Sequence, residues 1–316
     1  MNVTTIGSPA MWVGFIGFVL AMLLLDLGVI NRKTHEISIK EAVIWSAVWV
    51  TLATLFGAGI YYFFGAHRAM EFATGYLIEK ALAVDNIFIF LVIFSYFAVP
   101  KKQQHRVLFW GVLGALVMRG ALIGAGAALL QRFSWVLYIF GGILLLTSFK
   151  LLRERDDAGY EPDKNPAVRL FRKLVPMTDG PREGKFFVVE EGKRLATPLL
   201  LTLAVIEVSD VVFAVDSIPA IFSVTRDPFI VFTSNIFAIL GLRSMYFLLS
   251  GVMEKFHYLK VGLALVLGFI GAKMLLVDLL HIPIALSLGV VVVILAAAIG
   301  ASMIWPRPLA PAPREG

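Results

Sequence analysis

Two stretches of the chain, Ala83-Val84-Asp85-Asn86-Ile87-Phe88 and Ala214-Val215-Asp216-Ser217-Ile218-Pro219, are nearly the same, and they decide the fold. Each lies inside an apolar run long enough to cross a bilayer. A carboxylate within hydrocarbon costs roughly 2.5–3.5 kcal/mol on insertion scales, so a chain that places one twice is expected to use it. The pattern predicts a membrane protein with an internal repeat and a centre that handles cations.

The composition supports the membrane class and excludes several others. Of 316 residues, 59% are hydrophobic and 16% are charged, whereas soluble domains carry about 25% charged residues. The apolar runs have the length of spanning helices and lack the alternation of barrel strands. The chain has no cysteine, which excludes disulfides, thiolate metal sites and cysteine catalysis. The net charge of +6 does not indicate nucleic-acid binding, because most basic residues lie in connections beside apolar runs.

The fold class that follows is an all-α membrane protein with about nine transmembrane helices. Lysine and arginine concentrate in the odd-numbered connections and the C-terminal tail, while the even-numbered connections hold only Arg68, Arg132 and Arg226. The positive-inside rule therefore places the N-terminus outside and the C-terminus in the cytoplasm. The predicted helices cover residues 9–30, 42–64, 72–98, 107–130, 135–152, 197–223, 229–250, 259–280 and 283–305.

The segment of about 153–196 is the only sizeable polar part, and the orientation makes it cytoplasmic. Lys185-Phe186-Phe187-Val188-Val189-Glu190, followed by Glu191-Gly192, predicts a short β-hairpin. The simplest interpretation of the segment is a connector between two halves of one domain. A regulatory or metal-sensing role is the alternative.

The repeat extends beyond the two matching stretches. One unit covers about 72–152 and the other about 197–280, within a single polytopic membrane domain to which helices of about 9–64 and 283–305 are added. In each unit the carboxylate helix is followed by a helix with a mid-span arginine and then by one with a lysine. The predicted orientation makes the units antiparallel, an inverted 3+3 helix repeat of the kind found in many secondary transporters. The aligned pairs are Asp85 with Asp216, Glu79 with Asp210, Asn86 with Ser217, Arg119 with Arg243, and Lys150 with Lys273.

The acids of the third and sixth predicted helices form the candidate ion site. No histidine lies in mid-span and no thiol is present, so the available ligands are hard oxygens that suit Mg²⁺, Ca²⁺ or Mn²⁺. The alternative is that the acids only pair with the bases and lock helices together. In an intermediate interpretation, some acids bind the ion while the bases hold the site or replace the ion during return. The predicted metal ligands are Glu79, Asp85, Glu207, Asp210 and Asp216, with Asn86 and Asn235, and the predicted pairing residues are Arg119, Arg243, Lys150, Lys273 and Ser217.

Helical geometry adds two expectations. Asp216 lies about 180° from Glu207 on an unbroken helix, so one cavity could not receive both. Pro219 removes the backbone hydrogen bond to position 215, which predicts a discontinuity around 214–219 that redirects Asp216. The glycines of the fourth predicted helix, among them Gly114, are expected to permit close helix packing.

Two long motifs carry a resemblance to a known family. Residues 75–86, from Gly75 through Glu79 to Asn86, and residues 207–221, from Glu207 to Ile221, resemble the signatures of the TerC family of integral membrane proteins. The chain looks closest to the Alx branch of bacterial inner-membrane proteins. The resemblance implies manganese export, a bacterial inner-membrane location and a site made by the family's transmembrane acids, which match Glu79, Asp85, Glu207, Asp210 and Asp216 here.

The sequence thus leads to the hypothesis of a carrier that exports Mn²⁺ from the cytoplasm by alternating access, with proton exchange as the driving reaction. No nucleotide-binding motif is found, so direct ATP drive is not expected. The alternative is a membrane partner that supports metalation or insertion of exported proteins without carrying ions. An intramembrane enzyme is disfavoured because no mid-span histidine could help to activate water. The expected partners are a divalent ion and the bilayer, and no bound cofactor is expected.

Overall fold

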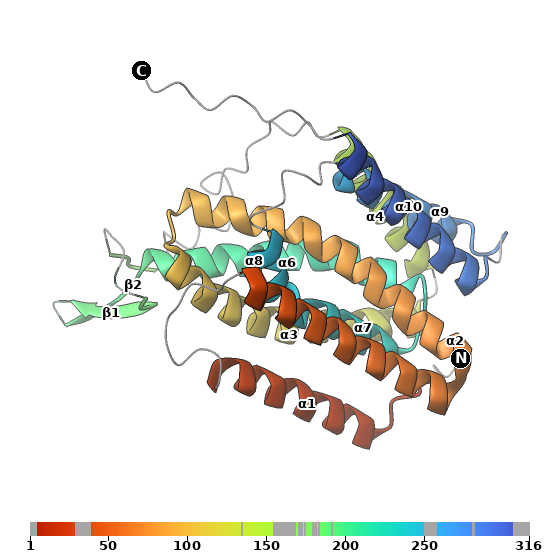
Figure 1. The fold of residues 1–316 in the computed structure, drawn as a ribbon, viewed down its shortest axis with the longest axis horizontal. Helices are drawn as coiled ribbons and strands as arrows, with labels where there is room; N and C mark the ends of the chain where they lie inside the picture. Colours follow the sequence, from red (N-terminus) through yellow and green to blue (C-terminus); the bar gives the residue numbers. More distant parts are fainter. Residues whose placement is uncertain are drawn as a thin grey trace.

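The computed structural model describes residues 5–28, 39–133, 135–153, 169, 173, 175–178, 182, 184–190, 192–249, 258–279 and 282–305. Helices make up most of this part, and the only paired strands are β1 and β2 (Figure 1). The elements are α1 (Pro9–Gly28), α2 (Ile39–Tyr96), α3 (Lys101–Arg132), α4 (Val136–Arg153), β1 (Phe187–Glu190), β2 (Lys193–Ala196), α6 (Pro198–Phe222), α7 (Pro228–Leu240), α8 (Leu242–Leu249), α9 (Leu259–Leu275) and α10 (Ile284–Ile304).

The predicted helices are found with two differences in how they join. The second and third predicted spans form the two arms of α2, which meet at Gly65, where the backbone is left-handed (φ 86°). Only glycine takes that conformation without strain. The seventh predicted span is divided at Gly241 into α7 and α8. Within the described residues, six helices are long and apolar enough to cross a membrane. A multi-pass helical membrane protein is therefore confirmed, while the number nine remains a prediction.

One expectation about α6 is wrong. The helix runs without interruption from Pro198 to Phe222, and Pro219 is part of it. Pro219 lies in the last turn, so it costs a single backbone hydrogen bond near a helix end instead of dividing the span. The predicted discontinuity around 214–219 is absent, and Asp216 keeps the direction that a regular helix gives it.

Helix α7 is the centre of the molecule, since all its residues from Phe229 to Leu240 are buried. Its N-terminus is capped by Asp227, whose carboxylate accepts hydrogen bonds from the backbone nitrogens of Phe229 and Ile230, and Pro228 occupies the first turn. Aromatic side chains of α1 and of the first arm of α2 pack around α7: Trp12, Phe15, Phe18 and Phe56 lie against Phe229, Phe232 or Phe237.

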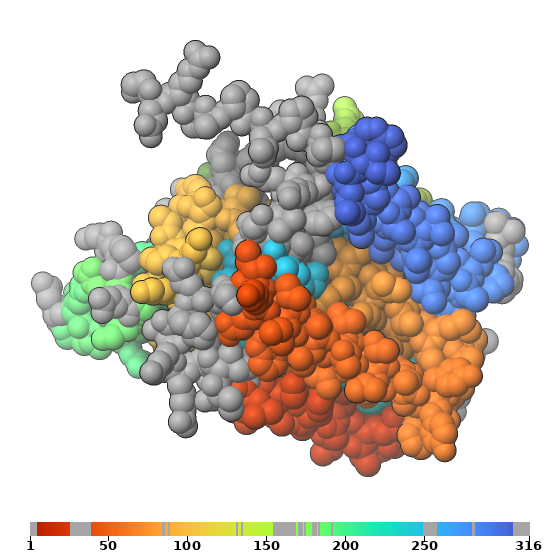
Figure 2. Space-filling view, viewed as in Figure 1, coloured from red at the N-terminus to blue at the C-terminus, as the bar shows by residue number. Residues whose placement is uncertain are grey.

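Helices α4, α9 and α10 form a group beside the main bundle (Figures 1 and 2). Helices α4 and α9 touch through their backbones where Gly141 and Gly271 meet, since a Cβ at Gly271 would lie 2.9 Å from the carbonyl oxygen of Gly141. Ser148 further donates a hydrogen bond of 2.7 Å to the carbonyl of Ala264. These contacts pair 141 with 271 and 148 with 264, so the two helices are antiparallel and packed through small residues.

The second arm of α2 packs antiparallel to α6. Gly75 of α2 faces Ile221 of α6. One turn later in α2, Glu79 bonds Arg119, and one turn earlier in α6, Ser217 bonds the same arginine. The helices that the sequence pairs as equivalents, α2 with α6 and α4 with α9, thus lie against each other in opposite directions. An inverted repeat requires its equivalent helices to run in opposite directions, as these do, and the repeat itself stays a prediction.

The predicted hairpin is confirmed. Strands β1 and β2 pair antiparallel with Val188 opposite Leu195 and Glu190 opposite Lys193. Gly192, in the turn, has a left-handed backbone (φ 75°), as tight hairpin turns demand. The rest of the predicted 153–196 connector lies largely outside the described residues.

Candidate functional site

The candidate site is centred on Arg119, which is fully buried in the middle of α3. Its Nε and Nη2 donate to the two carboxylate oxygens of Asp210 in α6, over 3.1 and 2.9 Å. Its Nη1 donates to Glu79 Oε1 in α2 and, over 3.3 Å, to Ser217 Oγ in α6. One guanidinium therefore joins three helices, with a bidentate contact to one acid and a single contact to the other. We call Arg119, Glu79, Asp210 and Ser217 the arginine cluster.

The two acids of the arginine cluster are those that the sequence alignment pairs as equivalents. Glu79 is completely buried and Asp210 is 5% exposed. Only one oxygen of Glu79 is satisfied, because its Oε2 is buried without a hydrogen-bond partner. A buried carboxylate oxygen without a partner costs on the order of 1–3 kcal/mol or more, so this atom is available to a further ligand.

Glu207 lies one turn before Asp210 on α6 and faces α3. Its carboxylate rests on Gly114, in the place where any larger residue would put its Cβ. Its Oε2 is also buried without a partner. Gly114 was expected to serve helix packing, and the structure shows a more specific role: it admits a carboxylate between the helices.

Asp216 points elsewhere. Its Oδ1 accepts a hydrogen bond of 2.8 Å from Thr147 in α4, and Lys150, one turn further along α4, lies close enough to act on its charge. Lys150 is itself exposed. Because α6 is regular, Asp216 and Glu207 occupy opposite sides of it. The expectation that Asp216 shares one cavity with the other acids of α6 is therefore wrong in this conformation.

Arg243, which the predicted repeat aligns with Arg119, has a different environment from it. Arg243 Nη1 lies 3.1 Å from His105 Nε2, near the start of α3. The structure begins α3 at Lys101, so His105 belongs to a helix and not to a connection. The side chain of Asp85 is outside the described part, and its predicted role as a ligand stays a prediction.

The neutral ligands proposed from the sequence are buried. Asn235 of α7 is completely enclosed, and neither its oxygen nor its nitrogen has a partner. Asn86 of α2 is 2% exposed, and its Nδ2 is likewise unpartnered. Contacts of Gly75 with Ser234, and of Gly120 with Phe232, place Asn235 at the level of the arginine cluster. Lys273 is separate from this cluster and donates a hydrogen bond of 2.9 Å to Ser287 in α10.

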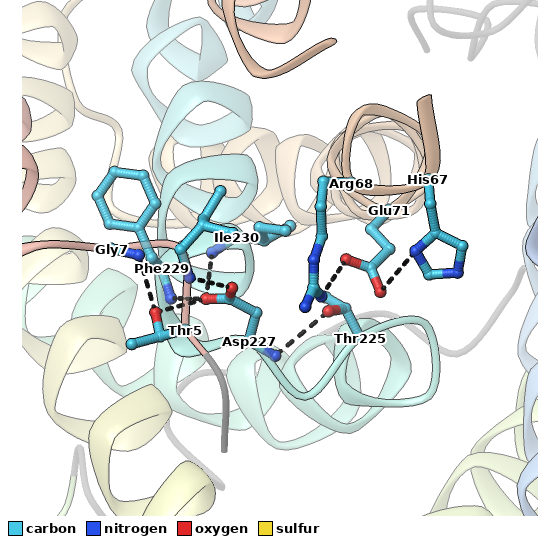
Figure 3. Close-up of polar contacts among 10 residues, drawn as sticks. Thr5, Gly7, His67, Arg68, Glu71, Thr225, Asp227, Phe229 and Ile230 are labelled. Atoms are coloured by element: carbon cyan, nitrogen blue, oxygen red, sulfur yellow. Dashed lines mark hydrogen bonds and ion pairs between the residues drawn. The ribbon is translucent and has the colours of Figure 1, made fainter. Parts of the chain in front are cut away.

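Two polar features at the C-terminal end of α6 were not found from the sequence. Glu71, 5% exposed, pairs with Arg68 over 2.8 Å and approaches His67 (Figure 3). It lines a cavity of about 200 Å³ together with Lys273 and Arg226. Its spacing of eight residues from Glu79, on the same side of α2, was a signal for it. Because Arg68 already neutralises Glu71, the two remaining bases make this cavity unsuitable as a cation site on its own.

The other feature is the contact between α7 and the N-terminal segment. Besides capping α7, the carboxylate of Asp227 accepts hydrogen bonds from Thr5 Oγ1 (2.8 Å) and from the backbone nitrogen of Ile6 (2.7 Å) (Figure 3). The capping residue was not singled out in the sequence, although an aspartate before Pro228 is a strong helix-start signal.

The described residues contain no group of three or more acidic or histidine side chains already arranged around a metal position. The structure instead shows acids held by a guanidinium, with unpartnered oxygens of Glu79 and Glu207 nearby. With Glu79, Asp210 and Glu207 ionised, these three acids and Arg119 carry a formal charge of −2. One divalent cation, or two protons, would neutralise it.

Fold and site together define a multi-pass helical membrane protein with a buried ionic cluster inside its span. Residues 64–308 match the model of the integral membrane protein TerC family. The chain belongs to this family, as the resemblance of its motifs indicated.

Relatives cover nearly the whole chain. An uncharacterized membrane protein of Myxococcus xanthus is 55% identical over 96% of this chain and 95% of its own length. Proteins named Alx, described as candidate membrane-bound redox modulators, are 53% identical in Escherichia coli K12 (91% and 92% covered) and 51% identical in Photorhabdus laumondii (92% and 94% covered). No protein of solved structure matches the chain.

Proposed function

We propose that this protein is a carrier for divalent cations that exports Mn²⁺ from the cytoplasm through the region of the arginine cluster. The observation that carries the proposal is the convergence of Glu79 and Asp210, from two antiparallel helices, on one fully buried guanidinium. Taking three charged groups out of water is costly, and a purely structural role could be met by apolar packing at lower cost. This desolvation cost is explained if Glu79 and Asp210 have a second partner that can exchange with Arg119.

In this proposal Arg119 takes the place of the ion when the site is empty. Entry of the ion withdraws Asp210 and Glu79 from the guanidinium, and Glu79 Oε2 and Glu207 Oε2 already lack protein partners. Ser217 and Asn235 supply neutral polar groups at the same level, and Asn86 lies about two turns further along α2. Hard oxygen ligands of this kind suit Mn²⁺ and related ions. Protons can neutralise the same carboxylates, which supports proton exchange as the driving reaction.

Asp216 and Asp85 are assigned to a second position along the path. Asp216 lies on the α4 side of α6, held by Thr147, and cannot reach the arginine cluster without a rotation of the helix. In an inverted repeat, Asp85 would be its counterpart in α2. The proposed setting is the bacterial inner membrane, with the N-terminus outside and the C-terminus in the cytoplasm.

The relatives' description as redox modulators needs no thiol chemistry in this chain, because the chain contains no cysteine. Control of manganese, a redox-active metal, would link ion export to redox balance without any electron transfer by the protein. The protein is accordingly proposed as a transporter and not as an enzyme.

Reconstitution into liposomes tests the proposal. The parent protein is expected to carry Mn²⁺ flux, and Glu79→Gln and Asp210→Asn are expected to lower it at least tenfold. Glu190→Gln, an equally conservative change of an acid in the hairpin, is the control and should leave flux unchanged. No flux in the parent would favour the membrane-partner alternative, and full flux in both site variants would show that these acids serve only the fold.

A further inference from the structure

One face of the β1–β2 hairpin is exposed and combines large apolar with basic side chains. Phe187 and Val189 are 52% and 69% exposed, and Lys185, two residues before Phe187, is exposed as well. Arg194 is paired with Val189 across the hairpin, and its guanidinium lies 5.9 Å from the ring centre of Phe187. Phe187, Val189 and Arg194 therefore share one surface, and together with the exposed Lys185 they form what we call the outer hairpin face.

The opposite face holds the hairpin to the helices. Phe186 is half-buried in an apolar cluster of the bundle, and the guanidinium of Arg106 in α3 lies 5.3 Å from its ring centre. Arg106 also donates a hydrogen bond of 2.6 Å to the carbonyl of Gly184, and the backbone nitrogen of Thr197 donates one of 3.0 Å to the carbonyl of Phe186. The hairpin is thus fixed in orientation, and its outer face is not free to fold back onto the protein.

The hairpin lies near the level at which the helices enter the membrane. Arg106 immediately precedes the apolar part of α3, and Thr197 immediately precedes α6, so both anchors mark the interface. In Figures 1 and 2 the hairpin projects from the end of the bundle where α3 and α6 begin. Lys101 and Lys102, both exposed, are on the same side. This is the side that the positive-inside rule assigns to the cytoplasm.

Among the described residues, the charges of the outer hairpin face have one sign. Lys185 and Arg194 are its described ionisable groups, while Glu190, an acid of the same hairpin, lies on the other face and is paired with Arg182 over 2.8 Å. Two apolar side chains are too small an area for a stable protein interface, which needs about 1,000 Å². They are sufficient for shallow insertion at a headgroup boundary, where bases strengthen binding to anionic lipid.

We propose that the outer hairpin face docks on the anionic phospholipid of the adjacent leaflet. Phe187 and Val189 enter the boundary between headgroups and acyl chains, and Lys185 and Arg194 contact lipid phosphates. This inference depends on the membrane location of the chain and not on ion transport.

The absence of cysteine makes the test direct, since a single introduced cysteine can carry a fluorophore. Val189→Cys places the label on the outer face, and Val188→Cys places it on the opposite face as a control. Each labelled protein is reconstituted in nanodiscs of phosphatidylcholine alone or with phosphatidylglycerol added. The readout is quenching by neutral lipid that carries a spin label near its headgroup. The label at 189 is expected to be quenched more strongly when phosphatidylglycerol is present, and the label at 188 is not.

Charge reversal separates lipid docking from simple proximity. Each base near an anionic surface strengthens association about fivefold. Lys185→Glu with Arg194→Glu, in the Val189→Cys background, should therefore return quenching to its level in phosphatidylcholine alone. Lys193→Glu, a reversal on the opposite face of the same hairpin, is the matched control and should have little effect. Equal quenching at 189 in the two lipids, or an equal effect of Lys193→Glu, would overturn the proposal.

Discussion

Gly114→Ala gives the sharpest prediction about the ion site. A Cβ at position 114 would lie 2.5 Å from Glu207 Oε2 and closer still to the rest of the carboxylate, whereas ordinary contact begins near 3.4 Å. The carboxylate must therefore move away by about 1 Å or more. The helix itself gains, because alanine is favoured over glycine by about 1 kcal/mol in a helix interior. The Gly114→Ala variant is expected to fold, but with the Glu207 carboxylate displaced from its present position between α3 and α6.

The magnitude follows from the ligand that is displaced. A hydrogen bond or ligand contact of a charged group contributes about 1.5–3 kcal/mol, so Mn²⁺ affinity should fall about 10- to 100-fold. Titration calorimetry on the purified protein measures this, with thermal unfolding as the check on folding. Gly124→Ala is the matched control on the same helix, because nothing lies within 4 Å of its Cβ position. Parent-like affinity in Gly114→Ala together with weakened binding in Glu207→Gln would refute the steric reasoning.

Three further predictions concern stability, each read by thermal unfolding. Arg119→Leu leaves two buried carboxylates without their cation and should destabilise the protein by about 3–5 kcal/mol. Adding Glu79→Gln and Asp210→Asn should restore a large part of that stability. No restoration would contradict the contacts of the arginine cluster. Gly271→Ala forces apart the α4 and α9 backbones and should cost about 1–3 kcal/mol, whereas Gly289→Ala, with open space at its Cβ, should be neutral. Asp227→Ala removes the N-cap of α7 and the hydrogen bonds to Thr5 and Ile6, and should lower stability by about 1–2 kcal/mol. It should also make the N-terminal segment accessible to protease. Unchanged cleavage would show that these hydrogen bonds do not hold the segment in place.

The helices were largely predictable from the sequence, although α3 begins six residues before its predicted start and α9 ends five residues before its predicted end. The length of the apolar runs set the spans, and local signals such as Gly65, Pro198 and Pro228 mark where the chain turns or a helix begins. The hairpin was also predictable, because alternation up to Glu190 and a glycine at 192 act within a few residues. These features depend on short-range physics that a single sequence contains.

The partners of the buried charges were not predictable in the same way. Five acids and four bases allow many pairings, and only helix packing selects Arg119 for both Glu79 and Asp210. The direction of Asp216 was predicted wrongly because the effect of Pro219 depends on its place in the helix: it removes one backbone hydrogen bond, and only three residues of α6 follow it, so the span is not divided. The role of Gly114 was invisible until the facing residue of α6 was known.

The hydrogen bond from Thr5 to Asp227 joins residues 222 positions apart. It closes a loop of about 70% of the chain, and its acceptor, Asp227, is the N-cap of α7, the most deeply buried helix. Contacts of such high contact order form late, because the loop must close before they contribute. During synthesis, α1 can therefore pack against α7 only after α7 has been made. A nascent chain released before residue 230 would leave the aromatic side chains of α1 without the α7 residues that they pack against.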